Sequence, residues 1–249
     1  MEKITAIIPC FNEEIHMNAV LESVKWADEI MVVDSFSTDK SLEIAQKHTD
    51  FIIQREYENS ASQKNWAIPQ ATHDWILLVD ADERVTPALK AEIQKILENP
   101  QSDAYWIYRQ NFFMGEEVKY SGIQNDKVIR LFKKDCRYEP LNVHAEILTK
   151  DLKVDFLKEK LTHDTFKGME AYLKKLHRYA NWAARDYMKK TPKVTLFHLL
   201  VKPGFRFFKH YILKGGIRDG RIGFIISSLT AWSVFLRYWK MMDIRLKEK

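Results

Sequence analysis

Short apolar runs alternate with helix-like patterns over the first hundred residues, and this alternation limits the possible folds. The apolar runs predict strands at residues 4–8, 29–33, 51–53 and 75–79. Helix-like patterns follow them at residues 15–26, 41–47, 61–68 and 87–97. Strands separated by helices form a mostly parallel sheet through right-handed crossovers. We therefore expect an α/β, Rossmann-like fold whose sheet is covered by helices on both faces.

The pattern changes after residue 100. Residues 104–148 have the texture of strands and loops, with strands expected at 128–132 and 143–148. Gly168 opens a long amphipathic helix, and the chain after Pro192 is aromatic, basic and apolar. We predict a catalytic domain at residues 1–165, with a nucleotide half (1–100) and an acceptor half (101–165), and a helical C-terminal extension at 166–249.

Glycine placement limits how this chain binds phosphate. All eight glycines lie at Gly115 or later. A dinucleotide fingerprint and a P-loop both need glycines after an early strand, so neither is present. A divalent cation, Mg²⁺ or Mn²⁺, is the simplest alternative source of positive charge.

Carboxylates follow the apolar run at 75–79, as Asp80-Ala81-Asp82-Glu83. An extended chain would place Asp80 and Asp82 on the same side and Ala81 on the other. Three neighbouring acids repel one another, and a hard cation among them would compensate. The other interpretation is a polar turn before the helix that Thr86 caps and Pro87 begins.

Two other predicted strands also end in polar loops. Residues 34–39 read Asp-Ser-Phe-Ser-Thr-Asp, and residues 9–14 read Pro-Cys-Phe-Asn-Glu-Glu. In open α/β sheets the ligand crevice lies outside the carboxyl ends of the strands. Each loop alone could be an ordinary strand-to-helix turn, but three neighbouring strand ends together indicate a nucleotide site.

The motifs at residues 7–13, 33–39, 63–67 and 80–83 together resemble the family 2 inverting glycosyltransferases of the GT-A fold. The most similar branch is the lipopolysaccharide-core β-1,4-glucosyltransferase-like proteins, and residues 216–220 also have the look of that branch. Phe36 departs from the family, which usually has glycine there, and the loop backbone is expected to differ slightly.

The resemblance implies a role for each matched residue. Asp34 would bind the uracil or ribose, with Pro9, Phe11 and Glu13 framing the pocket. Lys64 would approach the diphosphate, and Asn65 and Ala81 belong to the same donor segments. Asp80 would contact the ribose or the metal. Asp82 would be the main metal ligand, with His163 completing the metal or diphosphate site, although a lone histidine is more often structural.

The catalytic base has two candidates. An inverting transfer needs a carboxylate that accepts the proton of the attacking hydroxyl. Glu146 lies at the position that resembles the Val-His-Glu segment of the branch, with Ala145 inserted. Asp126 is the second candidate, although it could simply pair with Lys127 or Arg130.

The C-terminal extension predicts a membrane surface as partner, with no role for nucleic acid. Basic residues surround its apolar clusters, which suits a helix lying in the lipid interface. The uncharged run at 222–236 would span roughly 22 Å, short of the roughly 30 Å hydrocarbon core. A helical hairpin packed on the domain is the alternative. The N-terminus does not resemble a signal peptide, and two distant cysteines suit a reducing compartment, so we expect the cytoplasmic face.

These patterns predict a metal-dependent enzyme that transfers a sugar, glucose in our interpretation, from a UDP-sugar with inversion. The expected acceptor is a saccharide or glycolipid such as lipopolysaccharide core. Transfer to polyprenyl phosphate and a catalytically silent nucleotide-sugar-binding module remain alternatives. A nucleotidyltransferase would normally need a basic, glycine-rich N-terminal loop.

Overall fold

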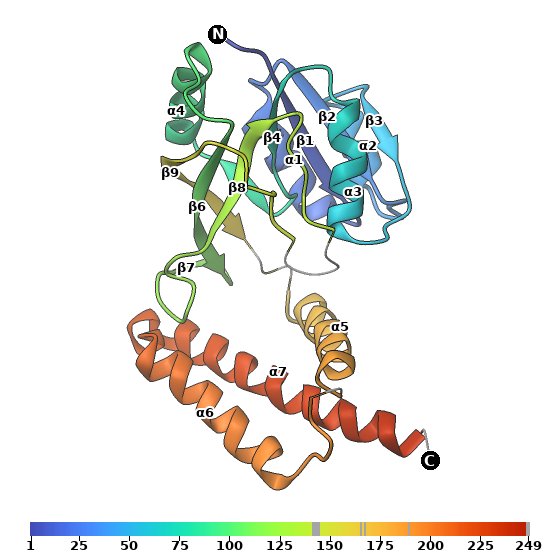
Figure 1. Cartoon of the computed structure of the whole chain (residues 1–249), viewed down its shortest axis with the longest axis vertical. Helices are drawn as coiled ribbons and strands as arrows, with labels where there is room; N and C mark the ends of the chain where they lie inside the picture. The colour runs from blue at the N-terminus through green and yellow to red at the C-terminus, as the bar shows by residue number, and fades with distance from the viewer. Residues whose placement is uncertain (141–144, 165, 167, 189, 248–249) are drawn as a thin grey trace. The chain divides into compact units, whose positions relative to one another are not determined.

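The computed structural model describes residues 1–140, 145–164, 166, 168–188 and 190–247 (Figure 1). The chain forms two compact units. The first consists of residues Met1–Gln110 and Asp126–His163, and the second of Asn111–Asn125 and Asp164–Lys249. The predicted β-strand segment at 143–148 falls partly on Val143 and His144, which lie outside the described residues. Residues 145–148 form no strand, and only Ile147 makes an isolated bridge, to Tyr138.

The first unit is built on one mixed sheet. In spatial order its strands are β3 (Ile52–Gln54), β2 (Glu29–Asp34), β1 (Ile4–Cys10), β4 (Trp75–Leu78), β8 (Lys127–Lys133), β6 (Ala104–Phe113), β9 (Val154–Asp164) and β5 (Glu83–Val85). The strands β3, β2, β1 and β4 pair in parallel. From β4 to β8 and from β8 to β6 the pairing is antiparallel, as it is between β9 and β5. The expected parallel sheet is therefore correct for residues 1–78, and the later strands make the sheet mixed.

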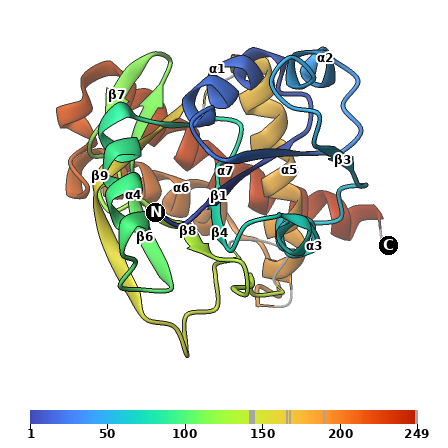
Figure 2. The ribbon, with the colours of Figure 1, turned by 90° about the horizontal axis from the view of Figure 1, so that it is seen from above.

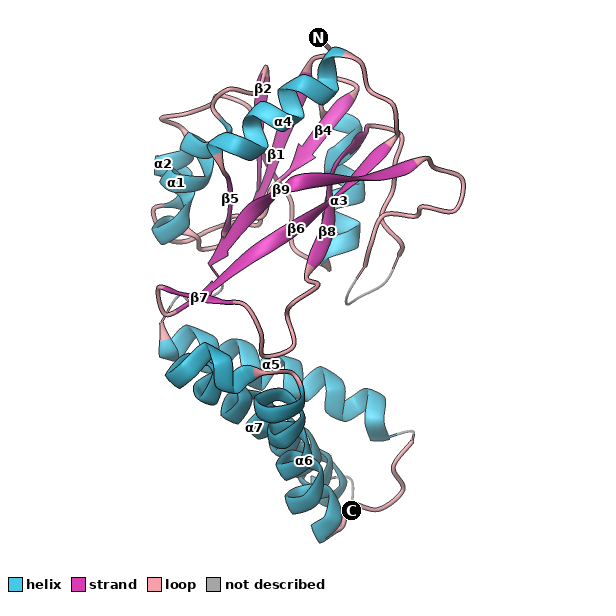
Figure 3. Ribbon diagram, turned by 90° about the vertical axis from the view of Figure 1, so that its left-hand side faces the viewer, coloured by secondary structure: helices cyan, strands magenta, loops and turns pink. Residues whose placement is uncertain are grey.

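Helices cover both faces of this sheet, as the unbroken apolar strands predicted. On β1, Ile4, Ala6 and Ile8 point to one core and Ile7 to the other. The first core includes α1 (Glu14–Val24), α2 (Ser41–Ala45) and α4 (Pro87–Glu98). The second includes α3 (Ser60–Ala67) and the 3₁₀ turn η1 (Ile68–Gln70). Figures 2 and 3 show β1 between these two sets of helices.

The helix-start signals of the sequence are seen in α4. The Thr86 hydroxyl accepts a hydrogen bond from the backbone N–H of Leu89 at 3.1 Å, and Pro87 is the first helical residue. The α3 helix is capped in the same way, since the Asn59 side chain accepts from the backbone N–H of Ser62 at 2.8 Å. Both caps hold the helices that follow strands β3 and β5.

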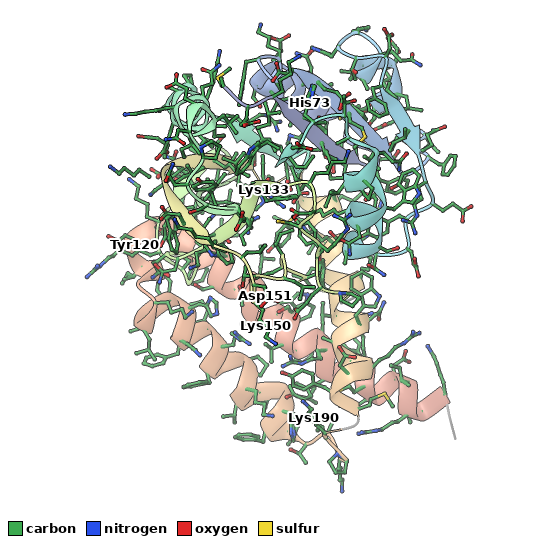
Figure 4. All side chains as sticks on the ribbon, turned by 45° about the horizontal axis from the view of Figure 1, so that its top comes forward. His73, Tyr120, Lys133, Lys150, Asp151 and Lys190 are labelled. Atoms are coloured by element: carbon green, nitrogen blue, oxygen red, sulfur yellow. The ribbon has the colours of Figure 1, made fainter. Side chains whose placement is uncertain are left out.

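The second unit contains a short hairpin and the C-terminal helices. Strand β7 (Glu116–Val118) pairs with the end of β6. The helices are α5 (Met169–Met188), α6 (Lys202–Phe208) and α7 (Gly220–Lys247), with π-helical segments η2 (Phe197–Val201) and η3 (Lys209–Leu213) and the 3₁₀ turn η4 (Gly216–Asp219). Asp219 ties the hairpin to this helical part, because its carboxylate accepts from the backbone N–H of Tyr120 (labelled in Figure 4) and the hydroxyl of Ser121.

The last helix is longer than the uncharged run predicted. Among the described residues, one helix, spanning Gly216–Lys247, is long and apolar enough to cross a membrane by length and composition. About a third of the residues in the most apolar 18-residue stretch of this helix are buried within the protein.

Candidate active site at the strand ends

The loops that follow β1 and β2 are bound to each other. The Asn12 backbone N–H donates to the Ser37 hydroxyl at 2.9 Å, and the Asn12 side-chain oxygen accepts from the backbone N–H of Thr38 at 2.8 Å. The Glu13 backbone N–H donates to the hydroxyl of Ser41 at 2.8 Å. Because each loop fixes the other, these two strand ends form one preorganised surface.

The carboxylate of Asp34 holds the loop that follows β2 by hydrogen bonds. It is fully buried at the end of β2 and accepts from the Ser37 hydroxyl at 2.5 Å and from the Gln54 amide at 2.9 Å. The thiol of Cys10 lies 3.5 Å from the same carboxylate. Burial, and then the charge of Asp34, raise the pKa of Cys10 well above its ordinary value. Contact of Asp34 with uracil or ribose remains a prediction, and in this structure its oxygens serve the loop.

Phe36 occupies a backbone conformation that favours glycine. Its φ is +60°, in the left-handed region, and Asn12 has φ +53° in the facing loop. Phe36 thus takes the φ region that glycine commonly occupies, and the expected difference of this loop from the family stays a prediction. The Phe36 and Phe11 side chains are both exposed. Pro9 pairs with Val33 inside the sheet and so holds the loop base.

Helix α3 presents two polar side chains toward residue 138. The Lys64 ammonium lies 3.2 Å from Asp80 and 5.2 Å from the centre of the Tyr138 ring. The Asn65 amide makes two hydrogen bonds with the backbone of Tyr138, at 2.8 and 2.9 Å. Asn65, which we predicted to contact the donor, thus clamps the Tyr138 segment in this structure. Lys64 is buried yet adjacent to the acidic strand end.

Residues 80–83 form a turn, and the expected extended chain is wrong. The Glu83 backbone N–H donates to the carbonyl of Asp80 at 2.8 Å, and Ala81 is buried. Arg84 holds the turn, since its guanidinium donates to the Ala81 carbonyl at 2.6 Å. Glu83 then begins β5, whose pairing partner β9 brings His163 opposite Glu83. The polar-turn alternative is therefore correct for the backbone.

Six side chains of alternating charge form a continuous series, which we call the charge chain: Lys64, Asp80, Arg130, Glu83, Arg109 and Asp126. Arg130 bridges Asp80 and Glu83, with 2.8 Å between its guanidinium and Glu83. Arg109 bridges Glu83 at 3.3 Å and Asp126 at 2.6 Å. Glu83 is fully buried at the centre and also accepts from the backbone N–H of Asp80.

This series corrects the reasoning that three acids need a cation among them. Basic side chains already offset Asp80 and Glu83, and the six formal charges sum to zero. Burial would raise the pKa of Asp80, but the charges of Arg130 and then Lys64 hold that pKa well below its ordinary value. Burial would lower the pKa of Arg130, whereas Asp80 and Glu83 raise it well above the ordinary value. Asp80 and Arg130 are therefore both ionised at neutral pH.

Asp82, in the same turn, lies next to His163. The His163 Nε2 atom is 3.7 Å from an Asp82 carboxylate oxygen, and both side chains are largely covered. A carboxylate and an imidazole suit Mn²⁺, and Mg²⁺ is commonly held by one or two carboxylates with substrate phosphates. Within the described residues, no three His, Cys, Asp or Glu side chains are placed to hold one ion. The pair fits a cation that takes its other ligands from a diphosphate.

The two candidate bases have different surroundings. The two carboxylate oxygens of Asp126 accept hydrogen bonds from the Arg109 guanidinium, at 2.6 and 3.0 Å. The pairing partner seen here is thus Arg109, where the sequence had offered Lys127 or Arg130. Glu146 is exposed, and its backbone carbonyl accepts from the N–H of Glu139 at 2.8 Å. The next residue, Ile147, bridges Tyr138, which lies over Lys64. Glu146 thus belongs to the segment beside the donor lysine.

Sequence reasoning missed the three central members of the charge chain: Arg109, Arg130 and Glu83. A signal for Arg130 was available, since it interrupts the apolar strand Val128-Ile129-Arg130-Leu131-Phe132. A charged residue inside such a strand is rarely buried without a partner. Glu83 was read as part of the acidic cluster, although its burial makes it the partner that Arg130 requires.

Comparison with known proteins identifies the family. The glycosyl transferase family 2 profile matches residues 5–178. The chain belongs to glycosyltransferase family 2. An uncharacterized glycosyltransferase of Rickettsia conorii is 29% identical over 261 residues, covering 100% of this chain and 93% of the relative. The lipopolysaccharide core biosynthesis glycosyltransferase LpsC of Rhizobium meliloti is 27% identical over 241 residues, covering 94% of this chain and 89% of LpsC.

A solved structure supports the fold. The crystal structure of Staphylococcus aureus TarS in complex with UDP-GlcNAc aligns with a TM-score of 0.50 at 14% identity, over 98% of this chain and 92% of that one. The resemblance drawn from the motifs and the GT-A fold are both confirmed. This family 2 member is a glycosyltransferase that uses a nucleotide-sugar donor.

Proposed function

We propose that this family 2 enzyme transfers a sugar, with inversion, from a UDP-sugar to a cell-envelope saccharide such as lipopolysaccharide core. The observation that carries the proposal is the pairing of Asp82 with His163 at 3.7 Å, since Asp82 shares one turn with Asp80, which contacts Lys64 at 3.2 Å. Both contacts lie at the carboxyl end of the parallel strands, where α/β sheets bind nucleotides. Glucose is the sugar that the branch resemblance favours.

Several residues would serve the donor. The joined loops after β1 and β2 present Phe11 and Asn12 over the buried Asp34, which suits a base and ribose. The Lys64 ammonium contacts one carboxylate oxygen of Asp80 at 3.2 Å. A diphosphate offers stronger acceptors, so Lys64 would turn from Asp80 toward it while Arg130 keeps Asp80 paired. The UDP-GlcNAc bound by TarS supports a UDP-sugar donor.

Asp82 and His163 would hold a divalent cation, Mg²⁺ or Mn²⁺, together with the diphosphate. When bound, the cation offsets the negative charge that grows on the leaving UDP. The carboxylate of Asp82 and the imidazole of His163 would fix its position, and the adjacent turn at 80–83 is held by Arg84. These residues orient the leaving group before the acceptor attacks.

Glu146 would be the catalytic base. Its carboxylate takes the proton of the acceptor hydroxyl as that oxygen bonds to the anomeric carbon, and the bond from this carbon to the UDP oxygen breaks. Glu146 is preferred over Asp126 because both carboxylate oxygens of Asp126 already accept hydrogen bonds from the Arg109 guanidinium. Glu146 is exposed and lies in the segment next to Tyr138 and Lys64.

The relatives and the second unit support a proposal for the acceptor and for the cellular location. LpsC is named for lipopolysaccharide core biosynthesis, which supports a saccharide acceptor carried on lipid. The second unit exposes large apolar side chains among basic residues, which suits the inner face of the cytoplasmic membrane. We therefore place the enzyme in the cytoplasm, bound peripherally to that face.

The reaction is tested by measuring UDP release from a panel of UDP-sugars with Mn²⁺ or Mg²⁺ and a lipopolysaccharide-core acceptor. Glu146→Gln should lower kcat by about 10²-fold or more, with donor KM little changed. Glu139→Gln is the matched control, since Glu139 is the exposed carboxylate opposite Glu146 in the backbone pair. Equal kcat in Glu146→Gln and wild type would refute the base assignment.

The metal assignment has its own measurement. Binding of UDP with Mn²⁺, followed by thermal shift, should be weakened at least about tenfold in Asp82→Asn and in His163→Ala. Asp151→Asn, on an exposed turn of the same unit, should bind like wild type. A UDP affinity that is the same with Mn²⁺ and with a chelator would rule the cation out, and absence of UDP release with every acceptor would leave a silent binding module.

A further inference from the structure

An exposed apolar stripe runs along the helical segment from residue 196 to 217. Its members are all more than two-fifths exposed: Leu196, Phe197, Leu200, Val201, Phe205, Phe208, Ile212, Leu213 and, in the turn that follows the helix, Ile217. Leu200 is 64% exposed and Phe205 is 60% exposed. The central members are three or four residues apart, which is the spacing of one helix face. Soluble monomers rarely expose so many contiguous large apolar side chains without a partner.

The opposite side of the same segment is already occupied. Phe207 and Tyr211 pack edge-on against Phe224 of α7, at ring distances of 5.6 and 5.8 Å. The Lys202 ammonium donates to the Tyr238 hydroxyl of α7 at 2.9 Å. The segment is therefore fixed on α7 by one side, and the apolar stripe is the side that α7 leaves uncovered.

The charge of this segment identifies its partner. Residues 190–218 contain no Asp or Glu, whereas they contain seven basic residues: Lys190, Lys193, Lys202, Arg206, Lys209, Lys214 and Arg218. An apolar stripe flanked by basic side chains complements an anionic lipid surface, where the charges meet phosphate groups and the apolar side chains enter the acyl boundary. A protein partner would not require such a complete absence of acidic residues.

We propose that residues 196–217 form an in-plane docking surface for anionic phospholipid bilayers, with α7 as its support. This deepens the peripheral location in the proposed function and rests on it. The uncharged run of α7, residues 222–236, reaches only roughly 22 Å of a roughly 30 Å hydrocarbon core. The turns of α7 that follow residue 236 carry charged residues and pack within the second unit. The Arg237 guanidinium lies 4.0 Å from the centre of the Tyr187 ring, and Met241 is buried. These contacts anchor α7 within the second unit.

The test is co-sedimentation of the full chain with vesicles, without donor or acceptor. Wild type should bind vesicles of phosphatidylcholine with about one-third phosphatidylglycerol far better than pure phosphatidylcholine, because basic residues each favour an anionic surface. Leu200→Ser with Phe205→Ser should lower the partition coefficient at least about tenfold. Lys193→Gln with Lys209→Gln should lower it roughly 30-fold on anionic vesicles only. Ile15→Ser, at a residue 70% exposed on α1, is the matched control.

Three outcomes would overturn the proposal. The first is equal binding of wild type and the Leu200→Ser/Phe205→Ser variant. The second is retention of wild type on vesicles after alkaline carbonate washing, which would indicate a spanning α7. The third is a wild-type dimer in sedimentation velocity that the serine variant abolishes, which would make the stripe a contact between copies.

Turnover of a water-soluble saccharide acceptor separates this proposal from the proposed function. The serine and glutamine variants should keep wild-type turnover with that acceptor, because their residues lie in the second unit and outside the site at the strand ends. Failure of wild type to turn over any acceptor would defeat the proposed function, while the vesicle result would still decide the docking surface.

Discussion

The two units of this glycosyltransferase treat charge and apolar surface in opposite ways. The first buries charged groups at its centre, since Arg130 and Glu83 are almost inaccessible, and covers both apolar faces of its sheet with helices. The second leaves a row of large apolar side chains exposed and keeps its basic groups outside. Buried charge must be paired to be tolerated, whereas exposed apolar surface indicates a missing partner. The first unit therefore satisfies its buried charges internally, whereas the exposed apolar row of the second is where we propose that a partner binds.

The largest effect that tests this contrast comes from breaking the charge chain. Arg130→Met should lower the free energy of unfolding by about 3–5 kcal/mol, because it leaves Glu83 buried and less paired. Lys133→Met on the same strand should change it by only about 0–1 kcal/mol, since the Lys133–Asp103 pair is exposed. Urea denaturation of both variants measures the difference. Similar losses in both would mean that burial does not set the value of these pairs.

The same contrast predicts unequal effects of removing a leucine side chain. Leu131→Ala, at a fully buried residue of β8, should lower the free energy of unfolding by about 2–5 kcal/mol. Leu200→Ala on the exposed stripe should stay within about 0.5 kcal/mol of wild type in the absence of lipid. Urea denaturation with and without anionic vesicles provides the measurement. A large loss at Leu200 without vesicles would show that the stripe is covered within the protein.

A smaller, pH-dependent effect is expected at the other end of the sheet. Burial would raise the pKa of Glu29, but hydrogen bonds from the Thr72 backbone and hydroxyl and from Thr5 hold it below the ordinary value of 4.5. A depressed folded-state pKa stabilises the fold above pH 4.5, and this stabilisation is lost as the pH falls through the folded-state value.

Glu29→Gln should therefore be less stable than wild type by under about 1 kcal/mol at neutral pH, and the gap should close in acid. Unfolding curves from about pH 7 to about pH 3 would follow it. A gap that widens as the pH falls would contradict the assignment. Glu43→Gln, in an exposed pair with Lys47, is the matched control.

Much of the first unit could be predicted from the sequence, because local signals and burial agree there. Continuous apolar runs predicted β1, β2 and β4, and Thr86 with Pro87 predicted the start of α4. The motif order also predicted the family, which the comparisons confirm. The three-residue strand β5 was missed because it carries Glu83 and Arg84, whose partners come from distant residues.

The electrostatic part of the site could not be predicted for the same reason. The repulsion of three adjacent acids is visible in the sequence, but the arginines that offset it lie on β6 and β8, about 26 and 47 residues away. The turn at 80–83 likewise depends on contacts with Arg84 and β9 rather than on local propensity. Asp82 and His163 were predicted from the resemblance, and the structure brings the two together.

The charge chain also restricts which amino-acid substitutions this site can accept during evolution. Its members are linked end to end, so replacing any inner one by a neutral residue leaves an odd charge enclosed in the protein. A tolerated exchange would have to alter two neighbours at once, such as Arg109 together with Asp126 at the end of the series. Attempts to redesign donor or acceptor preference near Asp80 should therefore vary these positions in pairs, since single substitutions in the charge chain would mostly yield destabilised proteins.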